Sequence, residues 1–219
     1  MRPTDVLLVI DVQRDFCPGG QLAIAAGDAV VPAINQLAGS FEHIVLTQDW
    51  HPADHASFAS QHAGKQPFDQ IELGYGPQTL WPDHCVQTTL GAEFHPELSA
   101  EVFARTELIL RKGFRSAIDS YSAFLENDKQ TTTGLAGYLR EREFKRIFVA
   151  GLAYDYCVRF SAVDAVGLGF ETWVIPDACR SVGPASSGPD SSEAAATLAF
   201  AEVGVHSITV AELLDLASE

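Results

Sequence analysis

The sequence predicts an α/β fold in three layers, in which helices cover both faces of a central, mostly parallel sheet of six strands. Two observations predict it. Short runs rich in Val, Ile and Leu alternate along the chain with segments in which apolar residues recur at helical spacing. Within the runs the apolar residues are consecutive rather than alternating, which is typical of strands covered on both faces. Such strands belong to parallel sheets between helical layers.

Six short runs predict the strands, and each is closed by polar residues, glycine or proline. In chain order they span residues 6–10, 43–47, 107–110, 147–150, 170–175 and 206–210. Because helical segments separate most of them, consecutive strands are expected to run parallel.

Five segments with apolar residues three or four positions apart predict the helices. They span residues 28–37, 133–143, 158–168, 191–201 and 211–217. In the first of them Val30, Ile34 and Leu37 share a face, and Gly39 is a suitable stop. A turn or short helix is expected at 120–124, and a loop rich in Gly, Pro and Ser at 181–190.

Residues 52–101 follow no regular period and contain many glycine, proline, histidine and aromatic residues. A long irregular segment in a compact protein is usually either functional or disordered. The aromatic residues argue against disorder, because they give the segment apolar surface to bury. No internal repeat and no linker is visible, so we expect a single domain over residues 1–219.

The composition excludes several classes of protein. The 219 residues are 47% hydrophobic, which suffices for a sizeable core. A net charge of −15 with no Lys/Arg cluster argues against nucleic-acid binding. No apolar stretch approaches the ~20 residues that span a membrane, and residues 6–10 are too short for a signal-peptide core, so a cytoplasmic protein is expected. The four cysteines lack a C-x-x-C pair and are expected to be free thiols.

Cys157 follows the predicted strand 147–150 through a glycine and begins the predicted helix 158–168. In the first turn of a helix, free N–H groups and the helix dipole lower the pKa of a thiol and favour the thiolate. A lone cysteine is more often a buried and inert side chain. The interpretation as a nucleophile therefore depends on what lies beside it.

Two charged residues also come directly after predicted strands. Asp11 abuts a Val-Ile run, where partial desolvation would raise the pKa of its carboxyl group and suit it to proton transfer. Lys112 follows the third strand, and an ammonium group near a thiol favours the thiolate. Alone, the first could be a loop anchor and the second a surface lysine. Because the carboxyl ends of parallel strands line one edge of a sheet, both could converge with Cys157.

Asp49 and His51 end the second strand, and residues two apart in an extended chain point the same way. A carboxylate and an imidazole on one face form half of a site for Zn²⁺, Mn²⁺ or Fe²⁺, and His84 could complete it from the irregular segment. His55 and His62 are alternative ligands. The other histidines, His43, His95 and His206, are expected on the surface or in the core.

Six motifs that contain these residues occur in a fixed order along the chain. They are 9–16 (VIDVQRDF), 47–52 (TQDWHP), 80–86 (LWPDHCV), 111–113 (RKG), 151–158 (GLAYDYCV) and 176–180 (PDACR). In this set and order they resemble the nicotinamidases (pyrazinamidases) among the isochorismatase-like cysteine hydrolases. The resemblance runs from the first predicted strand to the last.

The resemblance implies hydrolysis of nicotinamide to nicotinate and ammonia in NAD salvage, and also of pyrazinamide, by a triad of Asp11, Lys112 and Cys157. It implies one divalent ion, most simply Zn²⁺ with Fe²⁺ or Mn²⁺ as alternatives, held by Asp49 and two histidines. Those histidines are His51 and His84. The segment at about 49–101 would then bind both metal and substrate. Relatives occur as monomers and as larger assemblies, so a homo-oligomer is open.

The resemblance also implies roles around the substrate. Phe16, Trp81 and Tyr121 match positions that wall the aromatic ring. The Leu152–Ala153 peptide matches a cis bond, which would direct the Ala153 N–H, together with that of Cys157, at the developing oxyanion. Some relatives use a further ligand where Ser57 falls here, and Ser57 is expected to act through water.

Three other functions remain open. A relative of the same superfamily could act on a carbamoyl or ureido substrate, but such enzymes generally lack the Asp-x-His and His set. Hydrolysis of the vinyl ether of isochorismate does not use the cysteine. A non-catalytic binding protein could share the fold. Ammonia release from nicotinamide, with and without a chelator, separates these readings.

Overall fold

The computed structural model describes residues 1–183 and 191–218 and confirms the predicted fold class. Six strands form one sheet in the order β5-β2-β1-β6-β7-β8, and every neighbouring pair is parallel. Its strands are β1 (Asp5–Ile10), β2 (His43–Asp49), β5 (Thr106–Lys112), β6 (Arg146–Leu152), β7 (Glu171–Arg180) and β8 (His206–Ser207). The sheet is thus entirely parallel, where the sequence predicted a mostly parallel one.

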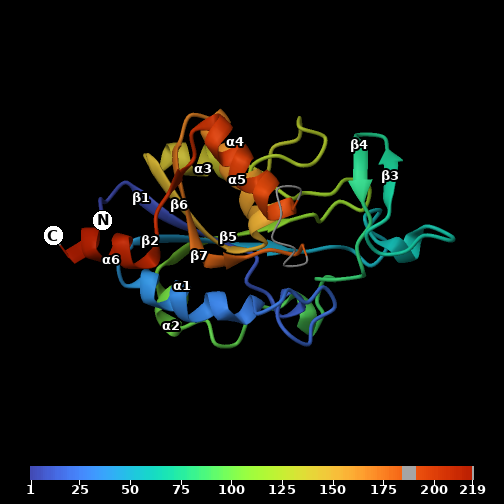
Figure 1. The fold of residues 1–219 in the computed structure, drawn as a ribbon, viewed down its shortest axis with the longest axis horizontal. Helices are drawn as coiled ribbons and strands as arrows, with labels where there is room; N and C mark the ends of the chain where they lie inside the picture. Colours follow the sequence, from blue (N-terminus) through green and yellow to red (C-terminus); the bar gives the residue numbers. More distant parts are fainter. Residues whose placement is uncertain (184–190, 219) are drawn as a thin grey trace.

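Helices cover both faces of this sheet (Figure 1). On one side lie α1 (Val30–Ala38), α2 (Ala100–Ala104) and α6 (Val210–Ser218), and on the other α3 (Leu135–Glu141), α4 (Arg159–Gly167) and α5 (Ser192–Val203). No helix in the described part of the chain is both long and apolar enough to cross a bilayer.

Strand β1 shows how the consecutive apolar residues are used. Its side chains alternate between two cores, with Leu7 and Val9 packing on the α1 side and Val6, Leu8 and Ile10 on the side of α3, α4 and α5. All six residues of the strand are buried. A run that is apolar at every position therefore supplies both cores, as expected for a sheet between two helical layers.

Several predicted boundaries were wrong. Strand β7 continues to Arg180, past the predicted end at residue 175, because a register shift lets Cys179 and Arg180 pair again with β6. Strand β8 has only two residues, and α6 begins at Val210, which the sequence placed in that strand. Of residues 120–124, predicted as a turn or short helix, 122–124 form bends and 120–121 have no regular structure. Of the loop predicted at 181–190, residues 184–190 lie outside the described residues.

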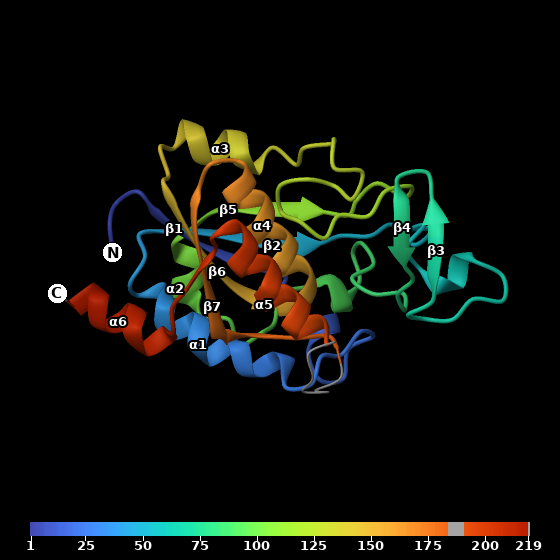
Figure 2. The same cartoon turned by 45° about the horizontal axis from the view of Figure 1, so that its top comes forward.

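The segment predicted to be irregular contains an antiparallel hairpin of β3 (Gln70–Leu73) and β4 (Gly76–Thr79), together with the start of α2. The hairpin stands apart from the main sheet, at the end toward which β2 and β5 point (Figure 2). The two chain termini lie at the opposite end of the molecule. The hairpin therefore lies at the carboxyl edge of the sheet, which is where a parallel α/β sheet binds its ligands.

Candidate active site

The predicted site residues meet at the carboxyl edge of four neighbouring strands. Asp11 follows β1, Asp49 ends β2, Lys112 ends β5, and Cys157 follows β6. These strands are adjacent in the order β5-β2-β1-β6, and the Cα atoms of Asp49 and Lys112 are paired in register. The order of the strands thus brings together residues that are up to 146 positions apart in the chain.

The ammonium group of Lys112 is at the centre of these residues. Its Nζ contacts a carboxylate oxygen of Asp49, lies 2.8 Å from Asp11 Oδ2 and 3.4 Å from Cys157 Sγ, and donates to the Ser120 carbonyl at 3.1 Å. Burial alone would lower the pKa of Lys112. The two carboxylates outweigh burial and raise this pKa well above its ordinary value, so the side chain stays charged.

Asp11 is fully buried and has a left-handed backbone, with φ at 47°. Its Oδ1 accepts a hydrogen bond of 2.6 Å from the Thr47 hydroxyl, and its own N–H donates to that hydroxyl at 3.1 Å. Burial raises the pKa of Asp11, against the opposing effect of Lys112. The expected upward shift is therefore present, and a carboxylate with a raised pKa is suited to accept a proton.

The expected downward shift of the Cys157 pKa is wrong. Cys157 lies in a turn of π-helix, Tyr154–Val158, that precedes α4 rather than in the first turn of that helix. Burial raises the pKa of the thiol well above its usual value, and Lys112 opposes this only in part, because Asp11 and Asp49 add negative charge nearby. One carboxylate oxygen of each lies within 4.8 Å of Sγ. The resting side chain is thus a thiol that needs a base.

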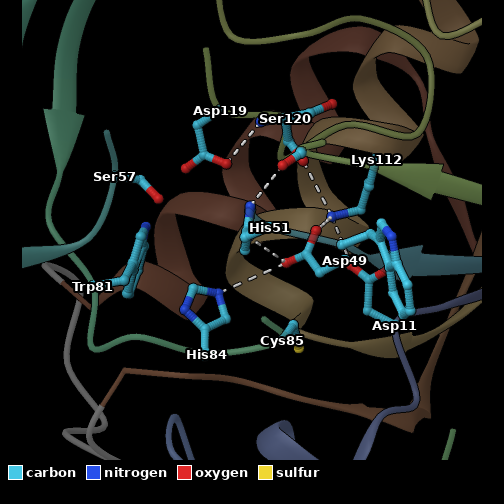
Figure 3. A network of polar contacts seen from close by, with 12 residues as sticks. Asp11, Asp49, His51, Ser57, Trp81, His84, Cys85, Lys112, Asp119 and Ser120 are labelled. Atoms are coloured by element: carbon cyan, nitrogen blue, oxygen red, sulfur yellow. Dashed lines mark hydrogen bonds and ion pairs between the residues drawn. The ribbon is translucent and has the colours of Figure 1, made fainter. Parts of the chain in front are cut away.

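Asp49, His51 and His84 form a buried cluster whose ligand atoms lie within 4.8 Å of one another (Figure 3). Asp49 Oδ2 lies 3.6 Å from Nε2 of His51 and 3.8 Å from Nε2 of His84. These separations are too long for hydrogen bonds and match ligand atoms that share a small cation, roughly 3–4 Å apart. Burial would raise the pKa of Asp49, but Lys112 and His51 hold it well below the ordinary value.

Backbone carbonyls orient both histidine rings. Nδ1 of His51 lies 2.9 Å from the Gly113 carbonyl, and Nδ1 of His84 lies 2.8 Å from the Pro82 carbonyl. Because a carbonyl can only accept, each Nδ1 carries the hydrogen and each Nε2 keeps its lone pair. Nitrogen and carboxylate ligands of this kind suit Zn²⁺ or Fe²⁺. The three residues therefore fit a divalent transition-metal ion.

The same cavity contains the expected substrate-binding positions. The cavity is lined by these four positions, which are Phe16, Trp81, Tyr121 and Ala153. Cys157 and the cluster of Asp49, His51 and His84 also line it. The Trp81 ring lies edge-on to that of Tyr121, with centroids 6.2 Å apart, and donates from Nε1 to the Tyr121 hydroxyl at 3.2 Å. The expected cis peptide between Leu152 and Ala153 is present. An aromatic carboxamide in this cavity would thus contact apolar walls, a thiol and the cluster of Asp49, His51 and His84.

Ser57 and the alternative histidine ligands are not among the three residues of this cluster. The Ser57 N–H donates to His55 Nδ1 at 3.3 Å, and its hydroxyl lies 2.7 Å from the same nitrogen. His55 Nε2 in turn lies 3.4 Å from the Ile118 carbonyl. Both ring nitrogens of His55 are thus engaged. His62 lies 2.8 Å from the Ala56 carbonyl and belongs to no metal-type cluster among residues 1–183 and 191–218.

Four further residues that line the cavity were not predicted from the sequence. They are Leu22, Asp119, Tyr156 and Val182. Three of them are ordinary apolar or aromatic side chains whose position depends on packing. Asp119 had one weak signal, since it stands two residues before Tyr121 in a stretch without regular structure.

Comparison with known proteins agrees with this geometry. Residues 5–212 match the isochorismatase domain family. The nicotinamidase of Acinetobacter baylyi is 55% identical over 176 residues, which cover 80% of this chain and 81% of the relative. The solved Acinetobacter baumanii nicotinamidase–pyrazinamidase is 50% identical with a TM-score of 0.92, and the match covers 97% of this chain and 99% of the other.

Two further solved structures contain ligands. PnC1 from L. infantum, in complex with nicotinate, is 36% identical with a TM-score of 0.82, over 97% of this chain and 96% of the other. The pyrazinamidase of Pyrococcus horikoshii, in complex with zinc, is 33% identical with a TM-score of 0.73, over 94% and 99%. With a family match over nearly the whole chain and relatives this similar, the protein is a member of the isochorismatase family of hydrolases.

Proposed function

We propose that this chain is an amidohydrolase that converts nicotinamide to nicotinate and ammonia in NAD salvage, and pyrazinamide to pyrazinoate. The observation that supports this most directly is the composition of the cavity. It is lined by Cys157, by the possible metal ligands Asp49, His51 and His84, and by the aromatic side chains of Phe16, Trp81 and Tyr121. Relatives named nicotinamidase support the choice of substrate. A cytoplasmic location and the single domain over residues 1–219 stay predictions.

Asp49, His51 and His84 would hold one divalent ion, for which zinc is the first choice because a related pyrazinamidase contains it. The ion would supply a Lewis acid for the ring nitrogen of the substrate and so fix the orientation of the ring. Phe16, Trp81 and Tyr121 would pack against the ring, which leaves its carboxamide beside Cys157.

The reaction would begin with transfer of the Cys157 proton to Asp11, while Lys112 stabilises the thiolate. The thiolate attacks the carboxamide carbon, and the N–H groups of Ala153 and Cys157 stabilise the oxyanion. Asp11 then returns the proton to the departing nitrogen, the C–N bond breaks, and ammonia leaves a thioester. A water that gives its proton to Asp11 hydrolyses the thioester to the carboxylic acid and restores the thiol.

Ammonia release from nicotinamide tests the proposal. We expect Cys157→Ala to lose at least about 10³-fold in kcat, because the change removes the thiol that forms the thioester. The control is Cys17→Ala, a buried free thiol that does not line the cavity, and it should retain near-normal activity. Substantial ammonia release by Cys157→Ala would rule out the thioester route, and no release by the wild-type protein from any amide would favour a binding protein.

A further inference from the structure

Asp119 is a buried carboxylate without a cationic partner. Its side chain lines the active-site cavity, and the residue is only 3% exposed. Oδ1 accepts from the Ser120 N–H at 2.7 Å, and Oδ2 accepts from Nε2 of Gln78 at 2.9 Å. Within residues 1–183 and 191–218, no Lys, Arg or His nitrogen lies within 4.0 Å of it. Neutral donors therefore orient this charge but do not balance it.

The Asp119 carboxylate lies near His51, one of the possible metal ligands, but does not contact it. One oxygen of Asp119 and one ring nitrogen each of His51 and His55 lie within 4.8 Å of one another, yet neither nitrogen comes within 4.0 Å of an Asp119 oxygen. This separation is too long for a direct hydrogen bond and leaves room for one bridging group. His55 offers no free lone pair there, because its Nδ1 accepts from Ser57 and its Nε2 faces the Ile118 carbonyl.

The formal charges of the side chains around the cavity indicate that Asp119 has a role in charge balance. Counted with their formal charges, the buried Asp11, Asp49 and Lys112 sum to −1, and Asp119 makes the sum −2. A divalent ion at Asp49, His51 and His84 would bring the buried group to neutrality while Cys157 is a thiol. Buried charge that is not compensated is costly, so the fourth charged side chain fits a cavity that holds such an ion.

We propose that Asp119 is part of the metal centre without binding the ion directly. It accepts a hydrogen bond from a water on the ion, on the His51 side, and its charge balances that of the ion. Gln78, from the hairpin β3–β4, and the Ser120 N–H orient the carboxylate for this contact. The inference rests on the proposed metal centre and extends it with a residue that strengthens metal binding rather than one that reacts.

The test measures metal affinity and not activity. Metal-free wild-type protein and its variants are titrated with Zn²⁺ against a competing chelator of known affinity at constant pH. We expect Asp119→Asn to bind Zn²⁺ about 10–100-fold more weakly, because loss of a group that supports a ligand shell has effects of this size. Asp54→Asn, an exposed acid near the same histidines, is the matched control and should stay within about twofold of the wild type.

A second pair of variants separates charge from shape. Asp119→Glu and Asp119→Gln disturb the packing equally, and only the first keeps the charge, so we expect it to bind Zn²⁺ at least about tenfold more tightly than the second. The inference is overturned if Asp119→Asn binds Zn²⁺ as tightly as the wild type and Asp119→Glu binds it no more tightly than Asp119→Gln. The proposed function would still stand in that case. Two ions per wild-type chain, with one lost in Asp119→Asn, also overturn it, because Asp119 would then be a direct ligand. No binding by the wild type overturns both proposals.

Discussion

Gly113 sets the orientation of His51 through both its small size and its carbonyl group. Its φ of +65° lies in the left-handed region that side chains rarely adopt, and an added Cβ would collide with the His51 ring. Its carbonyl accepts the hydrogen bond from His51 Nδ1. The glycine therefore both makes room for the ring and fixes its tautomer.

We predict that Gly113→Ala weakens Zn²⁺ affinity by at least about tenfold, because the displaced ring no longer directs Nε2 at the Asp49 carboxylate. It should also destabilise the protein by at least about 1 kcal/mol, from the strained backbone. Chelator competition and urea denaturation measure the two effects.

The control is Gly137→Ala, in the exposed middle of α3, where nothing lies near the added Cβ. That change should stabilise the protein by about 0.5–1 kcal/mol, because alanine favours a helix over glycine, and should leave metal binding unchanged. Normal metal affinity in Gly113→Ala would show that the ring does not depend on this contact.

At the scale of the elements, the turn between β6 and α4 carries Cys157 and is itself held by Asp155. The buried Asp155 carboxylate accepts from the N–H groups of Val182 and Gly183 at 2.9 and 3.0 Å and from the Ser192 hydroxyl at 2.6 Å. Val182 also lines the cavity. One side chain thus connects the nucleophile turn, a cavity wall and the start of α5.

We predict that Asp155→Asn raises the KM for nicotinamide several-fold and destabilises the protein by about 1–3 kcal/mol. An amide offers one acceptor oxygen to three donors, and its NH₂ would face an N–H group. Steady-state kinetics and thermal unfolding measure the outcome. Glu193→Gln is the control, since this exposed side chain accepts a hydrogen bond from the Ser181 hydroxyl at 3.1 Å. Wild-type KM and stability in Asp155→Asn would contradict the role of Asp155.

For the molecule as a whole, stability depends on contacts between layers as well as on the two cores. Glu107, on the edge strand β5, lies 2.5 Å from His43 Nδ1 on β2, accepts from the Tyr138 hydroxyl of α3 at 2.7 Å, and pairs with Arg142 at 2.9 Å. Burial alone would raise the pKa of Glu107, but the hydrogen bonds from Tyr138 and His43 outweigh it and lower this pKa below the ordinary value of 4.5.

The direction of the shift fixes its effect on stability. A lowered pKa in the folded protein means that Glu107 stabilises it above pH 4.5 and that this contribution is lost as the pH falls below that value. We predict that Glu107→Gln is less stable than the wild type at pH 7, by at most about 1 kcal/mol because the carboxylate is partly exposed to solvent. Urea denaturation at pH 7 and pH 4 should show the difference shrinking at the lower pH. A constant difference would exclude ionisation as the source.

The main elements were predictable because their signals are local. The buried parallel strands carry consecutive apolar residues, and α1 carries an apolar face. The hairpin β3–β4 was missed because β3 has partly exposed side chains, while β4, with the sequence GPQT, has low strand propensity. Helix α2 was missed because five residues are too few to show a period.

The order of strands and helices along the chain, and the residue types at the strand ends, can be predicted from the sequence alone, because periodicity and residue type are local properties. Two features depend on the folded arrangement: Asp11, Asp49 and Lys112 share one buried charge network, and the thiol of Cys157 has a raised pKa. Burial depends on which distant segments pack over a residue. Asp119 shows this most clearly, since the fold of the loop after β5 brings its carboxylate to Gln78 and near His51.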